Sequence, residues 1–407
     1  MGLVDSHWFK GCGNETRGGG KFCAAAVVAS VFVVTAALGA EPWTWTVEHP
    51  SPAPSSRFAH SMSYDAVRKV VVLFGGQANV PAGTGALNGE TWELAGAVWS
   101  QKIVAGPGAR GSQRSVFDSV RNRTVLFGGA NLSTTFQDTW EWDGATWVER
   151  NVAGPSARGG QAMAFDSVRG VTVLFGGSTV QGTMRLDTWE WDGTTWALRA
   201  QTGPSGRTLS AMAFDEGRGV SVLFGGFSGT AVLGDTWEWN GAGWTQRFVA
   251  GPPARTMSAM VYDEKIGAVV LVGGRLSGGN DFADTWAWNG TEWREIGTSG
   301  GIKAAYHGLA RDKSRDVIVR FGNQGSEFSA GTWKLNAPPC PSDLNGDRVV
   351  DDADFVIFLA AYNVMDCADA GMPADCPSDM NRDGVVDDSD FSVFVVGYDE
   401  MVCGGSV

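Results

Sequence analysis

The apolar residues between positions 43 and 336 fall into short runs that recur at intervals of 48 to 53 residues. Five runs end in a Gly-Gly pair whose first glycine is residue 75, 128, 176, 225 or 273, and Phe321-Gly322-Asn323 is an altered sixth copy. A Thr-Trp pair follows every run, and an Asp precedes the first glycine by ten residues in every copy. Six repeats in one register predict a fold built from one small structural unit.

Each unit predicts four short antiparallel strands, and the third copy illustrates the pattern. Residues 162–165 form a mostly apolar strand, a turn follows, and the β-branched run 171–175 is typical of a fully buried strand. The segment 188–191 alternates polar and aromatic residues, Asp192-Gly193 supplies a hairpin turn, and Trp196 opens the fourth strand. Four such strands in about fifty residues make one blade of a β-propeller.

The two ends of the repeat region predict how the propeller closes. The sixth copy stops at Asn336 without its second Trp, whereas residues 43–47 match the last strand of a unit but have no unit before them. The first strand therefore completes the last blade, which removes the exposed edges of the sheet. The fold class predicted for this region is an all-β, six-bladed propeller.

This repeat resembles the kelch family of β-propellers, which includes the central domain of galactose oxidase. The resemblance rests on the Gly-Gly pair after the second strand and the Trp of the fourth strand, and it covers residues 43–336. It implies a fold rather than an activity, because propellers carry many functions. The copper site of galactose oxidase needs a cross-linked Cys, and residues 41–339 contain none, so we assign no catalytic residue.

Two sets of propeller residues are candidates for ligand binding. Guanidinium groups that recur before the first strand of each blade suit carboxylate-bearing peptides or acidic sugars, although each could instead be structural within its own blade. The second set is a pair of histidines on the innermost strands beside the closure. This pair could bind a ligand or a metal, or could only form hydrogen bonds, and a transition metal usually needs a third protein ligand. The guanidinium groups belong to Arg57, Arg110, Arg158, Arg207 and Arg255, and the pair on the innermost strands is His60 and His307.

The loops that follow the Gly-Gly pairs break the symmetry of the repeat. They differ in length and sequence, and the first is about five residues longer than its counterparts. Variable loops on a rigid scaffold usually carry binding specificity, so we expect ligand contacts there first. The loops are residues 77–90, 130–138, 178–187, 227–235, 275–284 and 323–331.

The net charge of -13 lies entirely in residues 340–407, where fifteen acidic residues face two basic ones. The other 29 acids and 29 bases cancel, so a polyanion would gain nothing from the propeller and would be repelled by the tail. We therefore do not expect the protein to bind nucleic acid.

The acidic tail duplicates at an offset of 36 residues, and each copy carries oxygen ligands at positions 1, 3, 5, 9 and 12 of a loop, with a backbone carbonyl expected at position 7. Calcium is a hard cation that binds such oxygen sets. The predicted calcium ligands are Asp343, Asn345, Asp347, Val349, Asp351 and Asp354 in the first loop, and Asp379, Asn381, Asp383, Val385, Asp387 and Asp390 in the second.

Each loop leads into a segment with aromatic residues on one helical face, such as Phe355 and Phe358. Two such EF-hand-like units resemble a bacterial dockerin, which implies a calcium-dependent module that docks onto a cohesin-like scaffold protein. Two departures from the dockerin pattern affect affinity and partner choice. Arg348 replaces the usual glycine at loop position 6, and positions 10 and 11 are Asp352-Ala353 and Asp388-Ser389 rather than Ser-Thr.

The N-terminal residues predict a secretory signal. Arg17 and Lys21 precede an apolar run over residues 22–38, and small residues follow near Ala40; a retained membrane anchor is the alternative. Export permits disulfides, and the tail contains Cys340, Cys367, Cys376 and Cys403. We expect two disulfides there and leave their pairing open.

The sequence thus predicts four regions: a signal peptide at 1–40, a propeller at 41–336, a linker at 337–339 and a calcium-binding module at 340–407. We expect a secreted or cell-surface-associated protein, free of the membrane once the signal is cleaved. Its propeller would bind a protein or glycan, and its calcium-loaded tail would anchor it to a scaffold partner. The alternative is a polysaccharide-active hydrolase or lyase with catalytic residues in the loops, displayed by the same module.

Overall fold

The computed structural model describes residues 43–78, 85–301, 303–322 and 331–336, and toward the C-terminus residues 342, 344, 352–362, 378–380, 385–391 and 393–394. The chain divides into a unit of residues 1–39 and a unit of residues 40–407. The predicted signal, the linker and all six cysteines lie outside the described residues. Across the described ranges, no helix has the length and apolar character needed to cross a membrane.

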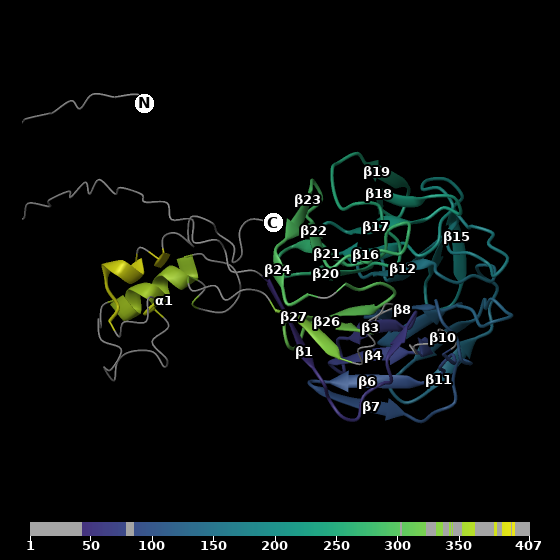
Figure 1. Ribbon diagram of the computed structural model, residues 1–407, viewed down its shortest axis with the longest axis horizontal. Helices are drawn as coiled ribbons and strands as arrows, with labels where there is room; N and C mark the ends of the chain where they lie inside the picture. The colour runs from purple at the N-terminus through teal and green to yellow at the C-terminus, as the bar shows by residue number, and fades with distance from the viewer. Residues whose placement is uncertain are drawn as a thin grey trace, which may run out of the picture. The chain divides into compact units, whose positions relative to one another are not determined.

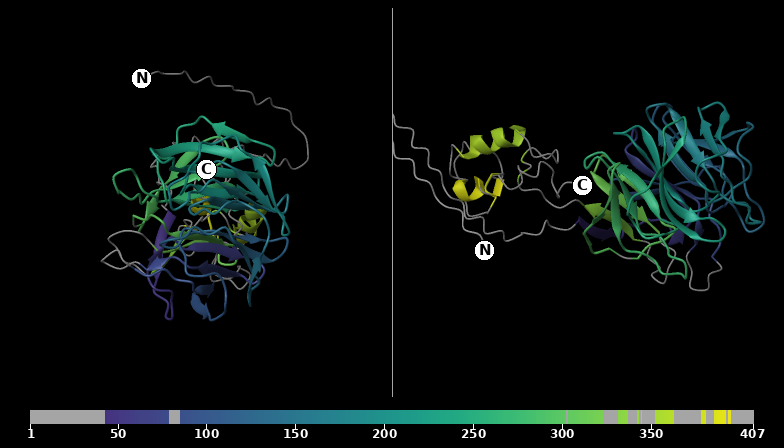
Figure 2. Two further views of the ribbon diagram at one scale, coloured as in Figure 1. Left: turned by 90° about the vertical axis from the view of Figure 1, so that its right-hand side faces the viewer. Right: turned by 90° about the horizontal axis from the view of Figure 1, so that it is seen from above.

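Six sheets surround a common centre and form a six-bladed β-propeller, as Figures 1 and 2 show. Each sheet pairs its strands in antiparallel order from the innermost strand outward. Blade 1 contains β3 (Ser61–Asp65), β4 (Val70–Phe74), β6 (Thr91–Ala95) and β7 (Val98–Lys102), and blade 2 contains β8 (Arg114–Asp118), β9 (Arg123–Phe127), β10 (Thr139–Trp142) and β11 (Trp147–Arg150).

The next three blades repeat this order. Blade 3 contains β12 (Ala162–Asp166), β13 (Val171–Phe175), β14 (Thr188–Trp191) and β15 (Trp196–Ala200). Blade 4 contains β16 (Ala211–Asp215), β17 (Val220–Phe227), β18 (Val232–Trp239) and β19 (Trp244–Arg247), and blade 5 contains β20 (Ala259–Asp263), β21 (Ala268–Val272), β22 (Thr285–Trp288) and β23 (Trp293–Ile296). A separate two-stranded pair joins β2 (Arg57–Phe58) to β5 (Gln77–Ala78).

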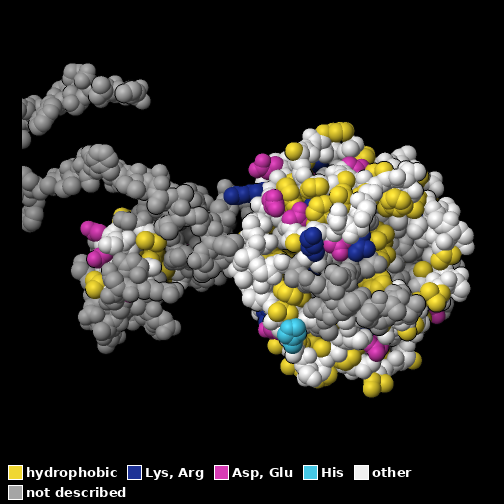
Figure 3. All heavy atoms as spheres, in the orientation of Figure 1, with side chains coloured by type: hydrophobic (Ala, Val, Ile, Leu, Met, Phe, Trp, Pro, Cys, Tyr) yellow, Lys and Arg dark blue, Asp and Glu magenta, His cyan; other side chains and the backbone are white. Residues whose placement is uncertain are grey.

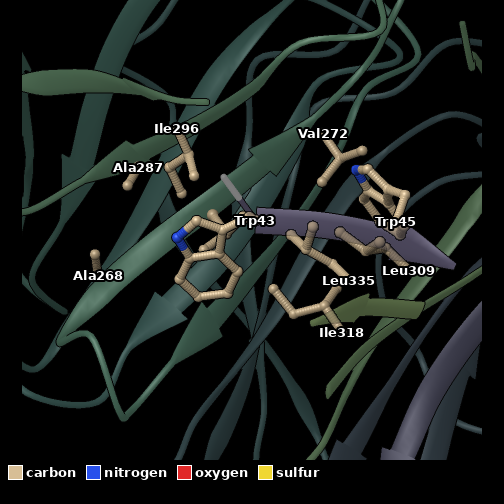
Figure 4. Close-up of a cluster of buried hydrophobic side chains, with 10 residues drawn as sticks. Trp43, Trp45, Ala268, Val272, Ala287, Ile296, Leu309, Ile318 and Leu335 are labelled. Carbon is tan, nitrogen blue, oxygen red and sulfur yellow. The ribbon is translucent and has the colours of Figure 1, made fainter. Parts of the chain in front are cut away.

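Blade 6 joins the two ends of the repeat region and confirms the predicted closure. It contains β25 (Gly308–Asp312), β26 (Val317–Phe321), β27 (Thr332–Asn336) and the first strand, β1 (Trp43–Glu48). Strand β1 runs antiparallel to β27, with Trp45 opposite Leu335, and its start also pairs with the short β24 (Thr298–Ser299). Figure 4 shows Trp43 and Trp45 of β1 among apolar side chains of blades 5 and 6, so closure buries two large aromatic residues.

Repeated tryptophans hold adjacent blades together, which explains the period seen in the sequence. In blades 2 to 5, the Trp that opens the fourth strand donates its indole N–H to a Thr of the preceding blade, for example Trp147 to Thr91 at 2.8 Å. Trp99 makes the equivalent bond to Thr332 at 2.9 Å and so joins blade 1 to blade 6. A buried indole N–H needs such an acceptor. The remaining bonds of this set are Trp196 to Thr139, Trp244 to Thr188 and Trp293 to Thr236.

The repeated Asp ends the innermost strand and organises the turn that follows it. Asp65 accepts backbone N–H bonds from Val67 and Arg68, and its second oxygen pairs with the Arg68 side chain at 2.8 Å. The ion pair recurs as Asp118–Arg121, Asp166–Arg169, Asp215–Arg218 and Asp312–Arg315. The repeated Asp is thus a structural residue of the turn.

In the acidic tail, α1 (Asp352–Tyr362) packs against the second copy of the duplicated segment. Ring centroids lie 5.9 Å apart for Phe355 and Phe394, 5.7 Å for Phe358 and Phe391, and 5.1 Å for Phe358 and Phe394. At the 36-residue offset of the duplication, Phe355 corresponds to Phe391 and Phe358 to Phe394. The first two contacts are therefore equivalent. The two helical segments therefore share a small aromatic core with local twofold symmetry.

Candidate functional site

The innermost strands of the six blades enclose a cavity of about 430 Å³ on the propeller axis. Its lining begins five residues before the repeated Asp, at His60 and His307, and ends one residue after it, at positions such as Glu216 and Lys313. A methionine belt lies between these ends, and aromatic residues form a collar beside the turns. The belt contains Met62, Met163, Met212 and Met260, and the collar contains Tyr64, Phe117, Phe165, Phe214 and Tyr262.

A ring of backbone hydrogen bonds lies at the other end of the inner strands, directly before the cavity lining. Each member donates its N–H to the carbonyl of its counterpart in the preceding blade at 2.7 to 3.0 Å, and each has a φ between 56° and 67°. Five members are not glycine, so their left-handed backbone is held by the surrounding structure. We call this feature the backbone ring; it contains Ala59, Ser112, Gly160, Leu209, Met257 and Tyr306.

The backbone ring separates the cavity from the loop face of the propeller. The Tyr306 hydroxyl lies 2.8 Å from the Ser112 hydroxyl, and the Phe58 and Tyr306 rings stack with centroids 6.0 Å apart. Ring members line a second, smaller hollow of about 210 Å³ on the loop side and are absent from the lining of the axial cavity. The cavity therefore opens toward the turns that follow the innermost strands.

His60 and His307 border the closed end of the cavity, with 1% and 4% of their surfaces exposed. The His60 ring interacts with the backbone of Phe321, whereas the ring nitrogens of His307 make no hydrogen bond within the described part of the chain. Burial, followed by the charges of Arg57 and Arg114, lowers the pKa of His60 to about 3. Burial, followed by the charges of Arg320, His60 and Arg114, also lowers the pKa of His307 well below its usual value. Both imidazoles are therefore neutral at neutral pH.

The structure brings the two histidines close enough for the charge of one to act on the other. Among the described residues, no group of three or more His, Cys, Asp or Glu is placed to hold a metal ion. The arrangement does not supply the third protein ligand that a transition-metal site usually needs. The role of His60 and His307 in ligand binding stays a prediction.

The five repeated arginines lie inside their blades with at most 2% of their surfaces exposed. Each donates to the carbonyl of the first glycine of the Gly-Gly pair, as Arg158 does to Gly176 at 3.0 Å. Each also pairs with a carboxylate at 2.5 to 2.6 Å. These contacts favour the structural alternative, and their ligand-binding role stays a prediction. The pairs are Arg57–Glu90, Arg110–Asp138, Arg158–Asp187, Arg207–Asp235 and Arg255–Asp284.

Sequence reasoning missed Arg114, a half-buried residue that lines the cavity from β8. Burial lowers its pKa, which the nearby Tyr306 partly offsets. Within the described residues its guanidinium forms neither an ion pair nor a hydrogen bond. Comparing the six copies position by position would have found it, because the other blades place a small residue four positions before the repeated Asp. Those residues are Ser61, Ala162, Ala211, Ala259 and Gly308.

Two of the variable loops border the hollow on the loop side of the backbone ring. Ala130 comes from the second loop, and Ser178, Thr179 and Val180 come from the third. Residues 79–84 and 323–330, in the first and sixth loops, lie outside the described residues. On the face of the propeller seen in Figure 3, the charged side chains of the described residues stand singly or in mixed-sign groups.

The tail places two predicted calcium ligands in equivalent positions. Asp354 accepts the backbone N–H of Leu344 at 2.7 Å, and Asp390 accepts that of Met380 at the same distance. Both aspartates are fully buried. Each bond joins position 12 of a predicted loop to position 2. The predicted ligands Asp343, Asn345, Asp347, Val349, Asp351, Asn381 and Asp383 lie outside the described residues.

Neither a scan against protein-family models nor a search of curated proteins finds a match for this chain.

Proposed function

We propose that the protein is a secreted or surface-associated binding protein without catalytic activity. Its propeller recognises a protein or glycan through the variable loops. Its acidic tail resembles a dockerin and, once loaded with calcium, anchors the propeller to a cohesin-like scaffold partner.

The observation that carries this proposal is the repeated loop contact of the tail. Asp354 and Asp390 close their loops with identical 2.7 Å bonds and are fully buried, although the tail bears a large excess of negative charge. Both carboxylates stand at position 12 of the predicted loop, where a calcium loop carries its last oxygen ligand. Calcium suits the all-oxygen ligand set, and two ions would bring the charge of the tail from -13 to -9.

The loop side of the propeller supports the binding role. The repeated arginines are engaged inside the blades, so recognition falls to groups that differ between blades. Residues of the second and third loops border a hollow of about 210 Å³ beside the backbone ring. A rigid ring that presents unlike loops suits selective binding of a protein or glycan surface.

Calorimetric titration of the full chain with calcium tests the anchoring module. The unmodified chain should bind two ions, and Asp390→Asn should leave one site with full affinity. Asp388→Asn is the matched control, because it removes the same charge two residues away from a carboxylate that is not a predicted ligand. Absence of calcium binding at millimolar concentration, or an equal effect of both variants, would overturn the calcium assignment.

Glycan and protein arrays probed with the full chain test the propeller, with the same preparation assayed on polysaccharide substrates. We expect selective binding without turnover. Release of cleaved sugars would overturn the non-catalytic role and favour a hydrolase or lyase. Swapping residues 178–187 for the counterpart 227–235 should change the selectivity if the loops carry it.

A further inference from the structure

Arg114 carries a charge into the propeller axis where the fold does not require one. Four of the other five blades place Ser or Ala at this position and the fifth places Gly308, so a small residue satisfies the architecture. The five repeated arginines all have carboxylate partners, and Arg311, at the mouth of the cavity, pairs with Asp263 at 3.2 Å. Among the described residues Arg114 has no such partner. A partly buried guanidinium without an anion is costly, which points to a ligand that supplies one.

We propose that the axial cavity is a binding site for a small monocarboxylate with an apolar body, anchored by Arg114. This site is separate from the loop-based recognition and the calcium-dependent anchoring proposed above. The carboxylate lies at the closed end of the cavity, and the apolar body extends along the methionine belt toward the aromatic collar.

The polar groups around Arg114 match a carboxylate. A guanidinium presents two parallel N–H donors to the two oxygens of one carboxylate. His60 and His307 line the same cavity as Arg114. The ring nitrogens of His307 have no hydrogen-bond partner among the described residues, so this histidine offers a neutral donor to the same anion.

A single negative charge fits better than two. The acidic residue in the cavity lining is Glu216, at the mouth, where it pairs with Lys313 at 3.0 Å. The cationic groups of the mouth, Arg311 and Lys313, already have carboxylate partners. The closed end therefore holds one uncompensated positive charge, which one carboxylate neutralises and a phosphate dianion would exceed.

The methionine belt and the aromatic collar give the cavity apolar surface for a ligand body of modest size, beside Ser63 and Ser115. Methionine side chains adapt to irregular shapes, and the collar offers ring faces and edges for an aromatic or aliphatic group. A volume of about 430 Å³ lies within the range of small-molecule sites. Entry is from the turn side, past the exposed Lys313–Glu216 pair, because the backbone ring occupies the other end.

Calorimetric titration of the full chain with 3-phenylpropionate tests the site, with 3-phenylpropanamide and inorganic phosphate as comparison ligands. We expect 3-phenylpropionate to bind at least tenfold more tightly than the neutral amide or phosphate. Arg114→Ala should weaken 3-phenylpropionate at least tenfold. Arg123→Ala should change it less than twofold, since it removes the same charge from the same blade outside the cavity lining.

Three outcomes would overturn the proposal: no binding of 3-phenylpropionate at 10 mM, equal binding by Arg114→Ala, or phosphate binding as tight as that of the carboxylate. Thermal unfolding shows that the variant folds and tests the same idea independently. Without ligand, Arg114→Ala should melt about 2 °C higher than the unmodified chain, because alanine occupies this position in blades 3, 4 and 5. A lower melting temperature would mean that Arg114 supports the fold and would also count against the proposal.

Discussion

The interior of each blade and the axial cavity use buried charge in opposite ways. Inside a blade, a guanidinium such as that of Arg158 has a carboxylate and a glycine carbonyl within hydrogen-bond distance. On the axis, Arg114 has neither among the described residues, and the ring nitrogens of His307 also have no hydrogen-bond partner there. The five repeated arginines are thus paired inside their blades, whereas Arg114, which breaks the repeat, is not. In a symmetrical fold, the unsatisfied exceptions are the better guide to function.

The largest expected effect on stability concerns the paired arginines inside the blades. Arg158→Ala removes the partner of the mostly buried Asp187 and of the Gly176 carbonyl, so the free energy of unfolding should fall by about 3 kcal/mol. Arg199→Ala removes an arginine that is half exposed and pairs with Glu190, and it should cost less than about 1 kcal/mol. Guanidinium chloride unfolding followed by tryptophan fluorescence measures both. Equal losses would show that the buried pairs contribute no more than surface pairs.

An intermediate effect tests how tightly the axis is packed at the closure. A Cβ at Gly308 would lie 2.5 Å from the Met62 sulfur and 2.6 Å from the Nε2 of His60, so Gly308→Ala should cost about 2 kcal/mol. Adding His60→Ser should recover most of this loss, because Ala162 and Ser210 already form that combination between blades 3 and 4. Denaturant unfolding of the single and double variants measures both changes. Additive losses would mean that the clash with His60 is not the cause.

A smaller effect concerns the buried histidines on the axis and the way they make stability depend on pH. The folded protein keeps His60 neutral, because burial lowers its pKa to about 3, whereas the unfolded chain protonates it below about pH 6.5. Stability should therefore fall as the pH drops through 6.5, by about 1 kcal/mol for His60 between pH 7.5 and pH 5.5. His60→Gln, which copies Gln113 and Gln161, should remove that share of the pH dependence. An unchanged slope would show that His60 does not titrate in this way.

The fold was predictable from the sequence because its period is long and its register strict. The Thr-Trp pairs and the truncated sixth copy gave the blade number and the closure of β1 on β27, and the structure confirms both. The repeated arginines show what the pattern could not decide. Their spacing of eighteen residues to the first glycine of the Gly-Gly pair was visible in every blade, but only coordinates show that the guanidinium donates to that carbonyl.

The candidate site was predictable only in part. His60 and His307 were expected as neighbours across the closure, because both occupy the same register position in adjoining blades. Arg114 escaped notice because the repeat was searched for shared residues, whereas its importance lies in being unlike its counterparts. Whether a side chain on an inner strand meets an acid depends on groups that converge from six blades, and spacing along the chain carries no such information.

The backbone ring also determines which electric field a ligand in the cavity experiences. Every N–H of the ring points toward the preceding blade, so six peptide dipoles follow one another around a circle and have no resultant along the axis. In a helix, by contrast, the dipoles add end to end and place partial charges at its termini. The backbone ring therefore adds no helix-like partial charge at the closed end of the cavity, so the charged side chains around that end, Arg114 among them, determine which charge a ligand can carry there.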